Sequence, residues 1–157
     1  MGKQEIILGI DLGTTTSESC IYSNNKIKMI KNGDGEEIIP SVVALSPSSK
    51  KIIVGIEADR LAEGNPNNVI AVVKREMGKN VELSLGNKKM SPEEVSAEIL
   101  KYIKNYSEES LGEKIKKAVI TVPANFGNDR RNATLKAGEL AGLDVVKIIN
   151  EPTAASL

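Results

Sequence analysis

IILGIDLGTTTS, residues 6–17, joins an apolar run to a glycine turn that carries three threonines. The apolar part, Ile6 to Ile10, is too short for a stable helix and contains β-branched residues, so it predicts a strand that is buried on both faces. Gly13 allows the chain to reverse tightly after this strand. The stretch therefore predicts a buried strand that leads into a narrow turn.

Polar side chains stand where this strand ends. Asp11 would lie at the mouth of the strand, where a carboxylate oxygen can hold Mg²⁺ directly or through its water molecules. Thr14 and Thr15 can donate hydrogen bonds to phosphate oxygens. Together these groups are the parts of a magnesium-phosphate site. The alternative is an ordinary hairpin, in which Asp11 pairs with a lysine and the threonines are present because they suit strands.

Phosphate loops of other kinds are missing from the sequence. It contains neither G-x-x-x-x-G-K-S/T nor G-x-G-x-x-G followed by a helix, which disfavours P-loop and dinucleotide-binding folds. Four stretches instead resemble, in order, signatures of the DnaK-type 70-kDa heat-shock chaperone family. They are GIDLGTTTS (residues 9–17), VKREMG (residues 73–78), VITVPA (residues 119–124) and IINEPTAA (residues 148–155). The resemblance spans nearly the whole chain and corresponds to the first lobe of that family's N-terminal ATPase domain.

The resemblance implies an α/β fold of the ribonuclease-H-like, actin type. We expect an ATPase lobe with a mixed five-stranded sheet flanked by helices. Residues 1–36 and 113–157 would form its core subdomain, and residues 37–112 a small inserted subdomain. The second lobe and the peptide-binding domain of the family would lie outside residues 1–157.

Periodicity, turn residues and capping residues predict the individual elements. Strands are predicted at Ser17–Ser23, Lys26–Ile30, Ser41–Leu45, Lys51–Val54, Lys117–Val122 and Val145–Ile149, the last of them buried. Helices are predicted at Ile56–Glu63, from the Ser91 cap to Leu111, from Asn128 to Gly142, and from Glu151 onward. The opening strands would form an antiparallel meander, and an alanine at every fourth position of the third helix would allow it to approach a sheet closely.

Composition narrows the function classes. At 40% hydrophobic residues, 157 residues can bury a core and form one domain with a subdomain. The 21 basic and 21 acidic residues cancel, which argues against a nucleic-acid or membrane surface. Cys20 is the only cysteine, so no internal disulfide forms, and the absence of histidine excludes cysteine-histidine catalysis. We interpret Cys20 as a packing residue. No signal peptide or span-length apolar stretch is present, so we expect a cytoplasmic location.

The resemblance also implies roles for the residues of the site. Asp11 would hold the water shell of Mg²⁺, and Gly13, Thr14 and Thr15 would contact the phosphates of ATP or ADP. Lys74 would face the γ-phosphate and the attacking water. Glu151 would orient or deprotonate that water and reach the metal through water. Two alternatives remain: Lys74 as an ordinary surface lysine, and Glu151 as a residue that only complements the N-terminus of its own helix.

Two further positions match residues that relay the nucleotide state to the substrate-binding domain in this family. They are Pro123 and Arg131, which could otherwise be a strand stop and a solvated helix residue. The chain departs from the family pattern at Thr16, where asparagine is usual, and at Asn125, where tyrosine is usual. The loss of the aromatic residue at position 125 puts the relay in doubt rather than the chemistry.

The sequence thus predicts the ATP-binding part of a chaperone that couples ATP hydrolysis, by direct attack of water, to the binding and release of unfolded polypeptides. J-domain and nucleotide-exchange co-chaperones would act on the intact protein, whereas residues 1–157 alone would bind nucleotide weakly with negligible turnover. One alternative is an actin-like filament protein or a sugar kinase of the same superfamily, against which the NEPTAA run argues. The other is a non-catalytic nucleotide-binding scaffold, for which keeping Asp11, Lys74 and Glu151 together would have no physical purpose.

Overall fold

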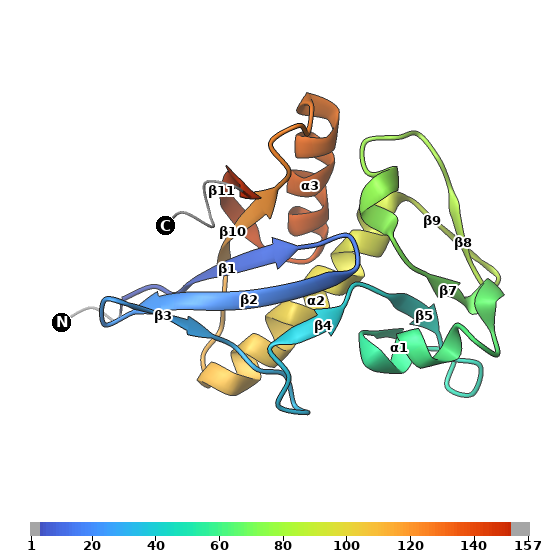
Figure 1. Ribbon diagram of the computed structural model, residues 1–157, viewed down its shortest axis with the longest axis horizontal. Coiled ribbons are helices and arrows are strands. Elements are labelled where there is room, and N and C mark those ends of the chain that lie inside the picture. Colours follow the sequence, from blue (N-terminus) through green and yellow to red (C-terminus); the bar gives the residue numbers. More distant parts are fainter. Residues whose placement is uncertain (1–3, 152–157) are drawn as a thin grey trace.

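A mixed sheet forms the centre of the computed structural model, which describes residues 4–151 (Figure 1). Its strands, in order across the sheet, are β11 (Asp144–Asn150), β10 (Lys117–Val122), β1 (Ile7–Leu12) and β2 (Thr16–Ser23), followed by β3 (Lys26–Met29) and β4 (Ile38–Pro40), which both pair with β2. β1, β10 and β11 run parallel, whereas β2 is antiparallel to all its neighbours. The α/β class and the mixed sheet are therefore as expected.

The sheet has six strands rather than the five that were expected, because β2 is long enough to serve two partners. Its residues Cys20–Ser23 pair with β3, and its residues Thr16–Glu18 pair with β4. Asn24 and Asn25 form the turn between β2 and β3 with φ values of 52° and 60°. Asparagine tolerates this left-handed geometry, which two-residue hairpins require. The predicted antiparallel meander is confirmed.

A second group of short elements lies between β4 and the long helix, gathered on one side of the molecule (green in Figure 1). The strands are β5 (Val43–Leu45), β6 (Ile52–Val54), β7 (Val69–Ile70), β8 (Leu83–Leu85) and β9 (Lys88–Met90), and the helical elements are α1 (Ile56–Leu61) and the 3₁₀ turns η1 (Pro66–Asn68) and η2 (Val73–Glu76). β5, β6 and α1 match the predicted elements. The remaining elements span only two to four residues, too few for periodicity to reveal.

The long helix α2 (Pro92–Leu111) begins and ends as the sequence predicts. The Ser91 side chain accepts a hydrogen bond from the backbone N–H of Glu94, and the Glu94 carboxylate accepts one from the backbone N–H of Ser91. This reciprocal capping box satisfies two donors that a helix N-terminus otherwise leaves unpaired. At the other end Gly112 has φ 67° and closes the helix in the left-handed conformation.

The helix α3 (Asn128–Leu140) packs closely against the sheet through small residues. Ala133, Ala137 and Ala141 are buried, as their four-residue spacing predicts. Gly138 lies on the same buried side, and a Cβ atom there would collide with the side chain of Val145 on β11. The small face therefore sets how near α3 comes to the sheet edge.

Both long helices cover one face of the sheet, and α2 crosses behind it in Figure 1. The prediction that the first strand is buried on both faces is wrong. Leu8 and Ile10 of β1 are at most 1% exposed, whereas Ile7, which points to the other face of the same strand, is 45% exposed. The reason is that, within residues 4–151, no helix covers the opposite face, which we call the open face.

The prediction of a buried last strand is also wrong, because β11 has a neighbour on one side only and contains no buried residue. The helix predicted from Glu151 onward lies, beyond that residue, outside the described residues. None of the helices between residues 4 and 151 is long and apolar enough to cross a membrane.

Candidate functional site

Acidic and hydroxyl side chains gather on the open face, around a hollow of about 390 Å³. Asp11, Glu18, Thr121 and Glu151 line it, and its floor is mostly apolar. The apolar part of the lining comes from Gly9, Cys20, Ile27, Met29, Val119 and Ile149. Strand alternation explains the grouping, because every second residue of β1, β2 and β10 points to this face.

Asp11 is held by a side chain from the neighbouring parallel strand. It is the register partner of Thr121 on β10, whose hydroxyl donates a hydrogen bond of 3.0 Å to its Oδ1 atom. β1 and β2 do form a hairpin, as the alternative interpretation required, but the hydrogen-bond partner of Asp11 is Thr121 rather than a lysine. Asp11 also lines the hollow, where its carboxylate can meet a ligand.

The turn between β1 and β2 needs glycine at its first position. A Cβ atom on Gly13 would collide with the backbone carbonyl of Thr16, so no other residue fits this backbone. The carbonyl of Thr15 accepts a hydrogen bond of 2.8 Å from the N–H of Ser41, which ties the turn to the end of β4. The side chain of Thr14 is half-buried, whereas Thr15 and Thr16 are exposed. The tight fit at Gly13 and the hydrogen bond to Ser41 therefore fix the turn that carries the threonine hydroxyls and the backbone N–H groups.

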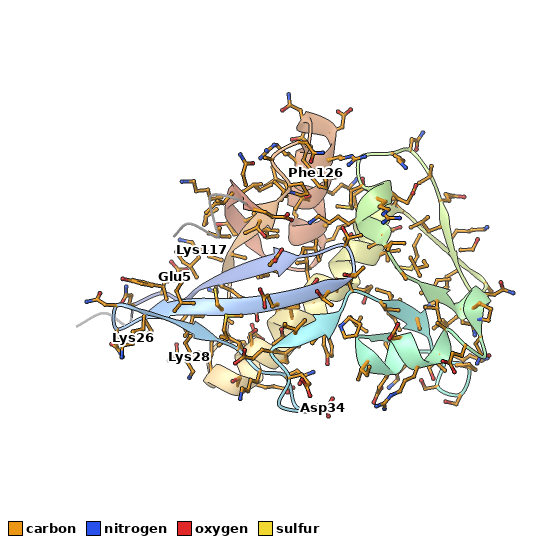
Figure 2. All side chains as sticks on the ribbon, in the orientation of Figure 1. Glu5, Lys26, Lys28, Asp34, Lys117 and Phe126 are labelled. Carbon is orange, nitrogen blue, oxygen red and sulfur yellow. The ribbon has the colours of Figure 1, made fainter. Side chains whose placement is uncertain are left out.

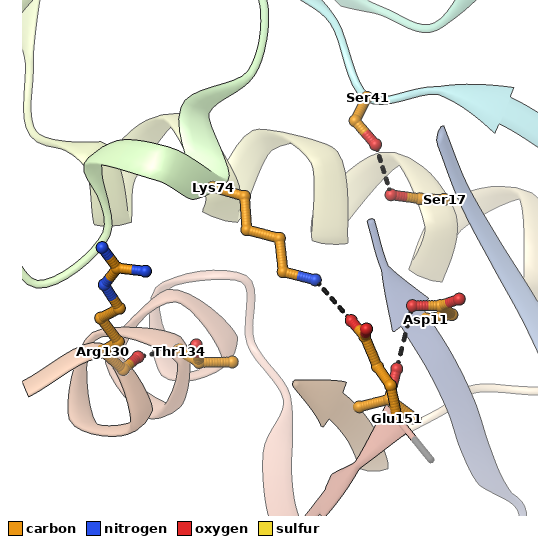
Figure 3. Close-up of polar contacts among 8 residues, drawn as sticks. Asp11, Ser17, Ser41, Lys74, Arg130, Thr134 and Glu151 are labelled. Carbon is orange, nitrogen blue, oxygen red and sulfur yellow. Dashed lines mark hydrogen bonds and ion pairs between the residues drawn. The ribbon is translucent and has the colours of Figure 1, made fainter. Parts of the chain in front are cut away.

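Lys74 and Glu151 form an ion pair across the site (Figure 3). The Lys74 Nζ atom lies 2.7 Å from the Glu151 Oε1 atom, and the two side chains are 7% and 39% exposed. Lysines are almost never buried to this extent unless they are paired. The interpretation of Lys74 as an ordinary surface lysine is therefore wrong. Figure 3 also shows that Glu151 lies beside the Asp11 carboxylate, and both line the same hollow.

The backbone before Lys74 is strained. Val72 has φ 51° and ψ 31°, which is the left-handed region. A β-branched residue adopts this conformation only where the surrounding structure enforces it, and such strain gathers at functional sites. Lys74 is thus presented by a 3₁₀ turn that tertiary contacts hold in place.

Pro123 and Arg131 meet through the loop that follows β10. The backbone N–H of Phe126 donates to the carbonyl of Pro123, and the carbonyl of Phe126 accepts from the Nε atom of Arg131 at 3.1 Å. The Nη2 atom of Arg131 also donates to the Asn150 side chain at 2.6 Å. Arg131 is therefore no solvated helix residue, and it links this loop to the strand end beside Glu151. Asn125 is exposed.

Cys20 lies half-buried on the floor of the hollow. Burial raises the pKa of its thiol, and the neighbouring Glu18 carboxylate raises it further. A raised pKa keeps the thiol protonated and poorly nucleophilic. Both observations agree with the interpretation of Cys20 as a packing residue.

Four residues near the site were not singled out from the sequence. They are Thr121, Phe126, Arg130 and Asn150. Thr121, Phe126 and Asn150 contact residues that were singled out, and Arg130 lies over the Phe126 ring. Thr121 and Asn150 lie inside quoted motifs, but only the register of β10 against β1 and the position of α3 reveal their partners. Phe126 is the only phenylalanine in the chain, which is a weak signal by itself.

Comparisons with a family model and with individual known proteins point to the same family. The model of the family described as "Hsp70 protein" matches residues 7–84 and 79–157. The chain is 51% identical over 154 residues to "Chaperone protein DnaK" of Mycoplasmopsis synoviae (strain 53), which is 98% of this chain and 25% of that protein. It is 50% identical over 157 residues to the protein of the same name from Mycoplasma mycoides subsp. mycoides SC, which is 100% of this chain and 26% of that protein. The chain thus spans about a quarter of the length of these relatives.

Proposed function

This chain belongs to the Hsp70 family, and from that premise we propose that it is the ATP-binding part of a molecular chaperone. The whole protein would couple ATP hydrolysis to the binding and release of unfolded polypeptides. The observation that carries the proposal is the buried Lys74 ammonium paired with Glu151 beside Asp11. A buried cation at a carboxylate-lined hollow suits the binding of a phosphate chain.

The proposal extends to the architecture. The lobe would be the ribonuclease-H-like core of an actin-type ATPase, with residues 1–36 and 113–157 as its core subdomain. Support comes from the sheet, which draws β1, β2, β3, β10 and β11 from these two segments. Residues 37–112 would be the inserted subdomain, and they contain a separate three-stranded sheet and a hairpin.

The groups around the hollow fit a magnesium-nucleotide complex. Mg²⁺ prefers oxygen ligands and keeps several of its water molecules, so two carboxylates that receive it through water suffice. Asp11 and Glu151 offer such carboxylates on the same hollow. Gly13, Thr14 and Thr15 offer hydroxyl and backbone groups at the adjoining turn, and Lys74 offers positive charge for phosphate oxygens.

Each residue would act through its own chemistry. The bound magnesium-ATP complex would supply the phosphoanhydride bond and a divalent charge. Asp11, oriented by Thr121, would hold water molecules of the metal. Glu151 would orient a water molecule and accept its proton, and Lys74 would exchange part of its pairing with Glu151 for a phosphate oxygen. The reaction would be direct attack by water, without a phosphoenzyme.

The remaining parts of the proposal concern the whole protein. Its partners would be unfolded polypeptides together with J-domain and nucleotide-exchange co-chaperones, and its location would be the cytoplasm. Pro123 and Arg131 would pass the nucleotide state onward, since Arg131 is bonded both to the loop after β10 and to Asn150 next to Glu151.

The test is ATP hydrolysis by the whole protein with Lys74→Ala. We expect kcat to fall by about two orders of magnitude, the usual loss when a group that stabilises transition-state charge is removed. Lys79→Ala is the matched control, because the Lys79 side chain is 49% exposed and, among residues 4–151, forms its ion pair with Glu76. Unchanged turnover in Lys74→Ala would contradict the assigned site. Nucleotide binding without any turnover in the parent protein would instead favour the non-catalytic scaffold.

A further inference from the structure

Two cations lie over the ring of Phe126. The Lys74 Nζ atom is 5.7 Å from the ring centroid, and the Arg130 guanidinium carbon is 5.1 Å from it. Phe126 is 7% exposed, so the ring is largely shielded from water. An aromatic face attracts cations through its quadrupole within about 6 Å, and the attraction grows when water is excluded. The geometry therefore meets the conditions for a cation-π contact on the lysine of the site.

The ring itself is fixed from the backbone. The backbone N–H of Phe126 donates a hydrogen bond to the carbonyl of Pro123, and the carbonyl of Phe126 accepts one from the Nε atom of Arg131. Two hydrogen bonds therefore hold its main chain. Arg131 in turn reaches Asn150, the residue before Glu151, which pairs with Lys74. These contacts form a closed path that runs from Lys74 to Phe126, on through Arg131, Asn150 and Glu151, and back to Lys74. Phe126 is thus linked to Lys74 both through its ring and through Arg131, Asn150 and Glu151.

Arg130 also ties the segment that follows Lys74 to the start of α3. The left-handed Gly78 packs so closely here that a Cβ atom on it would lie 3.0 Å from the Arg130 backbone nitrogen and 3.1 Å from its Cγ atom. Arg130 therefore lies against both the Gly78 turn and the Phe126 ring. These contacts bring the Gly78 turn, which follows η2, close to the start of α3 and the loop after β10. Figure 2 shows Phe126 beside the start of α3.

We propose that Phe126 is a positioning residue, which holds the Lys74 ammonium at the place where it meets the phosphate chain. The expected effect on ATP hydrolysis rests on the proposed function, whereas the contact between Phe126 and Lys74 does not. The physical reason is that the ring attracts the ammonium without neutralising it. Glu151 also holds Lys74, but a carboxylate cancels the charge that a phosphate needs. A neutral aromatic partner preserves that charge and leaves the N–H groups free to donate.

The first test compares substitutions of Phe126 in the whole protein. Phe126→Leu keeps apolar bulk but removes the quadrupole, and we expect kcat to fall about tenfold with little change in KM. Phe126→Tyr keeps the aromatic face, so it should restore kcat to within about twofold of the parent. Tyr106→Leu is the matched control, because it also removes a buried aromatic ring. Tyr106 lies on α2 and contacts Tyr102 and Ser19 rather than Lys74. The control substitution should lower Tm without lowering kcat.

The second test does not depend on turnover. In whole protein labelled with ¹³C-lysine and free of nucleotide, the Lys74 signal is assigned by its loss in Lys74→Arg. Its ε-methylene protons should lie upfield of those of the other lysines because of the ring current. The shift should vanish in Phe126→Leu and persist in Phe126→Tyr.

The outcomes separate the two proposals. Unshifted Lys74 protons in the parent, or equal kcat for the leucine and tyrosine variants, would overturn the positioning role even if the protein hydrolyses ATP. A ring-current shift that Phe126→Leu abolishes, in a protein that neither binds nor hydrolyses ATP, would support the contact and overturn the proposed function instead.

Discussion

Lys74 and Asp11 owe their chemistry to partners that are far away in the sequence. Lys74 pairs with a residue 77 positions later, and Asp11 with one 110 positions later. The Lys74 side chain is only 7% exposed. Without its carboxylate partner it would lower the stability of the folded chain by several kcal/mol, on the order of 3 to 5, because its charge would be buried and unpaired. At the scale of single residues, the site is therefore a set of pairs that only the folded chain can assemble.

Cys20 supplies a prediction at this scale. Because burial and the Glu18 carboxylate raise the pKa of its thiol, less thiolate is present at neutral pH. We expect iodoacetamide to alkylate Cys20 more slowly in the folded chain than in the chain unfolded by urea. The rate in the folded chain should still be rising at pH 9. Measurement of the alkylation rate against pH by mass spectrometry checks this.

Glu18→Gln is the matching variant for Cys20. It removes the charge that contributes to the raised pKa while leaving the burial, so the reaction should become faster without reaching the rate of the unfolded chain. Equal rates in the folded and unfolded parent would show that the thiol is not shielded as the structure indicates.

At the scale of elements, α3 and β11 illustrate how small residues set a distance. α3 approaches the sheet through alanines at every fourth position and through Gly138, whose missing side chain leaves room for Val145. The C-terminal part of β11 carries Asn150 and leads directly to Glu151. The packing of α3 therefore also fixes the strand from which the Glu151 carboxylate reaches Lys74.

Gly138→Ala is the prediction at this scale. The exchange would gain about 1 kcal/mol of helix propensity, but overpacking against Val145 costs about 1 to 3 kcal/mol. We expect a net loss of stability and a Tm lowered by about 3 °C, measured by differential scanning calorimetry. Gly64→Ala is the control, since no atom lies within 4 Å of the added Cβ, and its Tm should match the parent. A Gly138→Ala chain as stable as the Gly64→Ala chain would show that α3 can move away freely.

At the scale of the whole molecule, the open face is the dominant feature. Asp11, Thr121 and Glu151 lie on it together with exposed apolar side chains such as Ile7 and Ile27. Within residues 4–151, the lining of the hollow comes from strands β1, β2, β3, β10 and β11 and from Glu151. Such an open hollow can fix only part of a nucleotide.

The corresponding prediction concerns residues 1–157 on their own. We expect them to bind magnesium-ATP weakly and to show negligible turnover, because a group bound from one side loses the positioning that catalysis requires. Isothermal titration calorimetry and a phosphate-release assay, with the whole protein as the reference, check both parts. Robust magnesium-dependent turnover by residues 1–157 would contradict this view of the open hollow.

Much of the local structure was predictable because its causes are local. The capping box at Ser91, the left-handed Gly112, the asparagine turn after β2 and the alanine spacing of α3 each depend on residues within one or two turns of one another. The four motifs likewise identified the family, which the comparisons confirm. Two errors concerned burial, because the first strand and the last strand both lack the burial that their apolar composition predicted. The sixth strand of the sheet and the shortest elements were also missed.

The sequence by itself thus determined the long helices with their caps, the longer strands, the tight glycine turn after Asp11, and the family. The tertiary structure alone decided that Lys74 is buried, that Thr121 orients Asp11, that Phe126 contacts Lys74, and that one face of the sheet stays open. The physical reason is range. Backbone conformation and capping depend on a few adjacent residues, whereas burial and pairing between distant residues depend on how all elements pack at once.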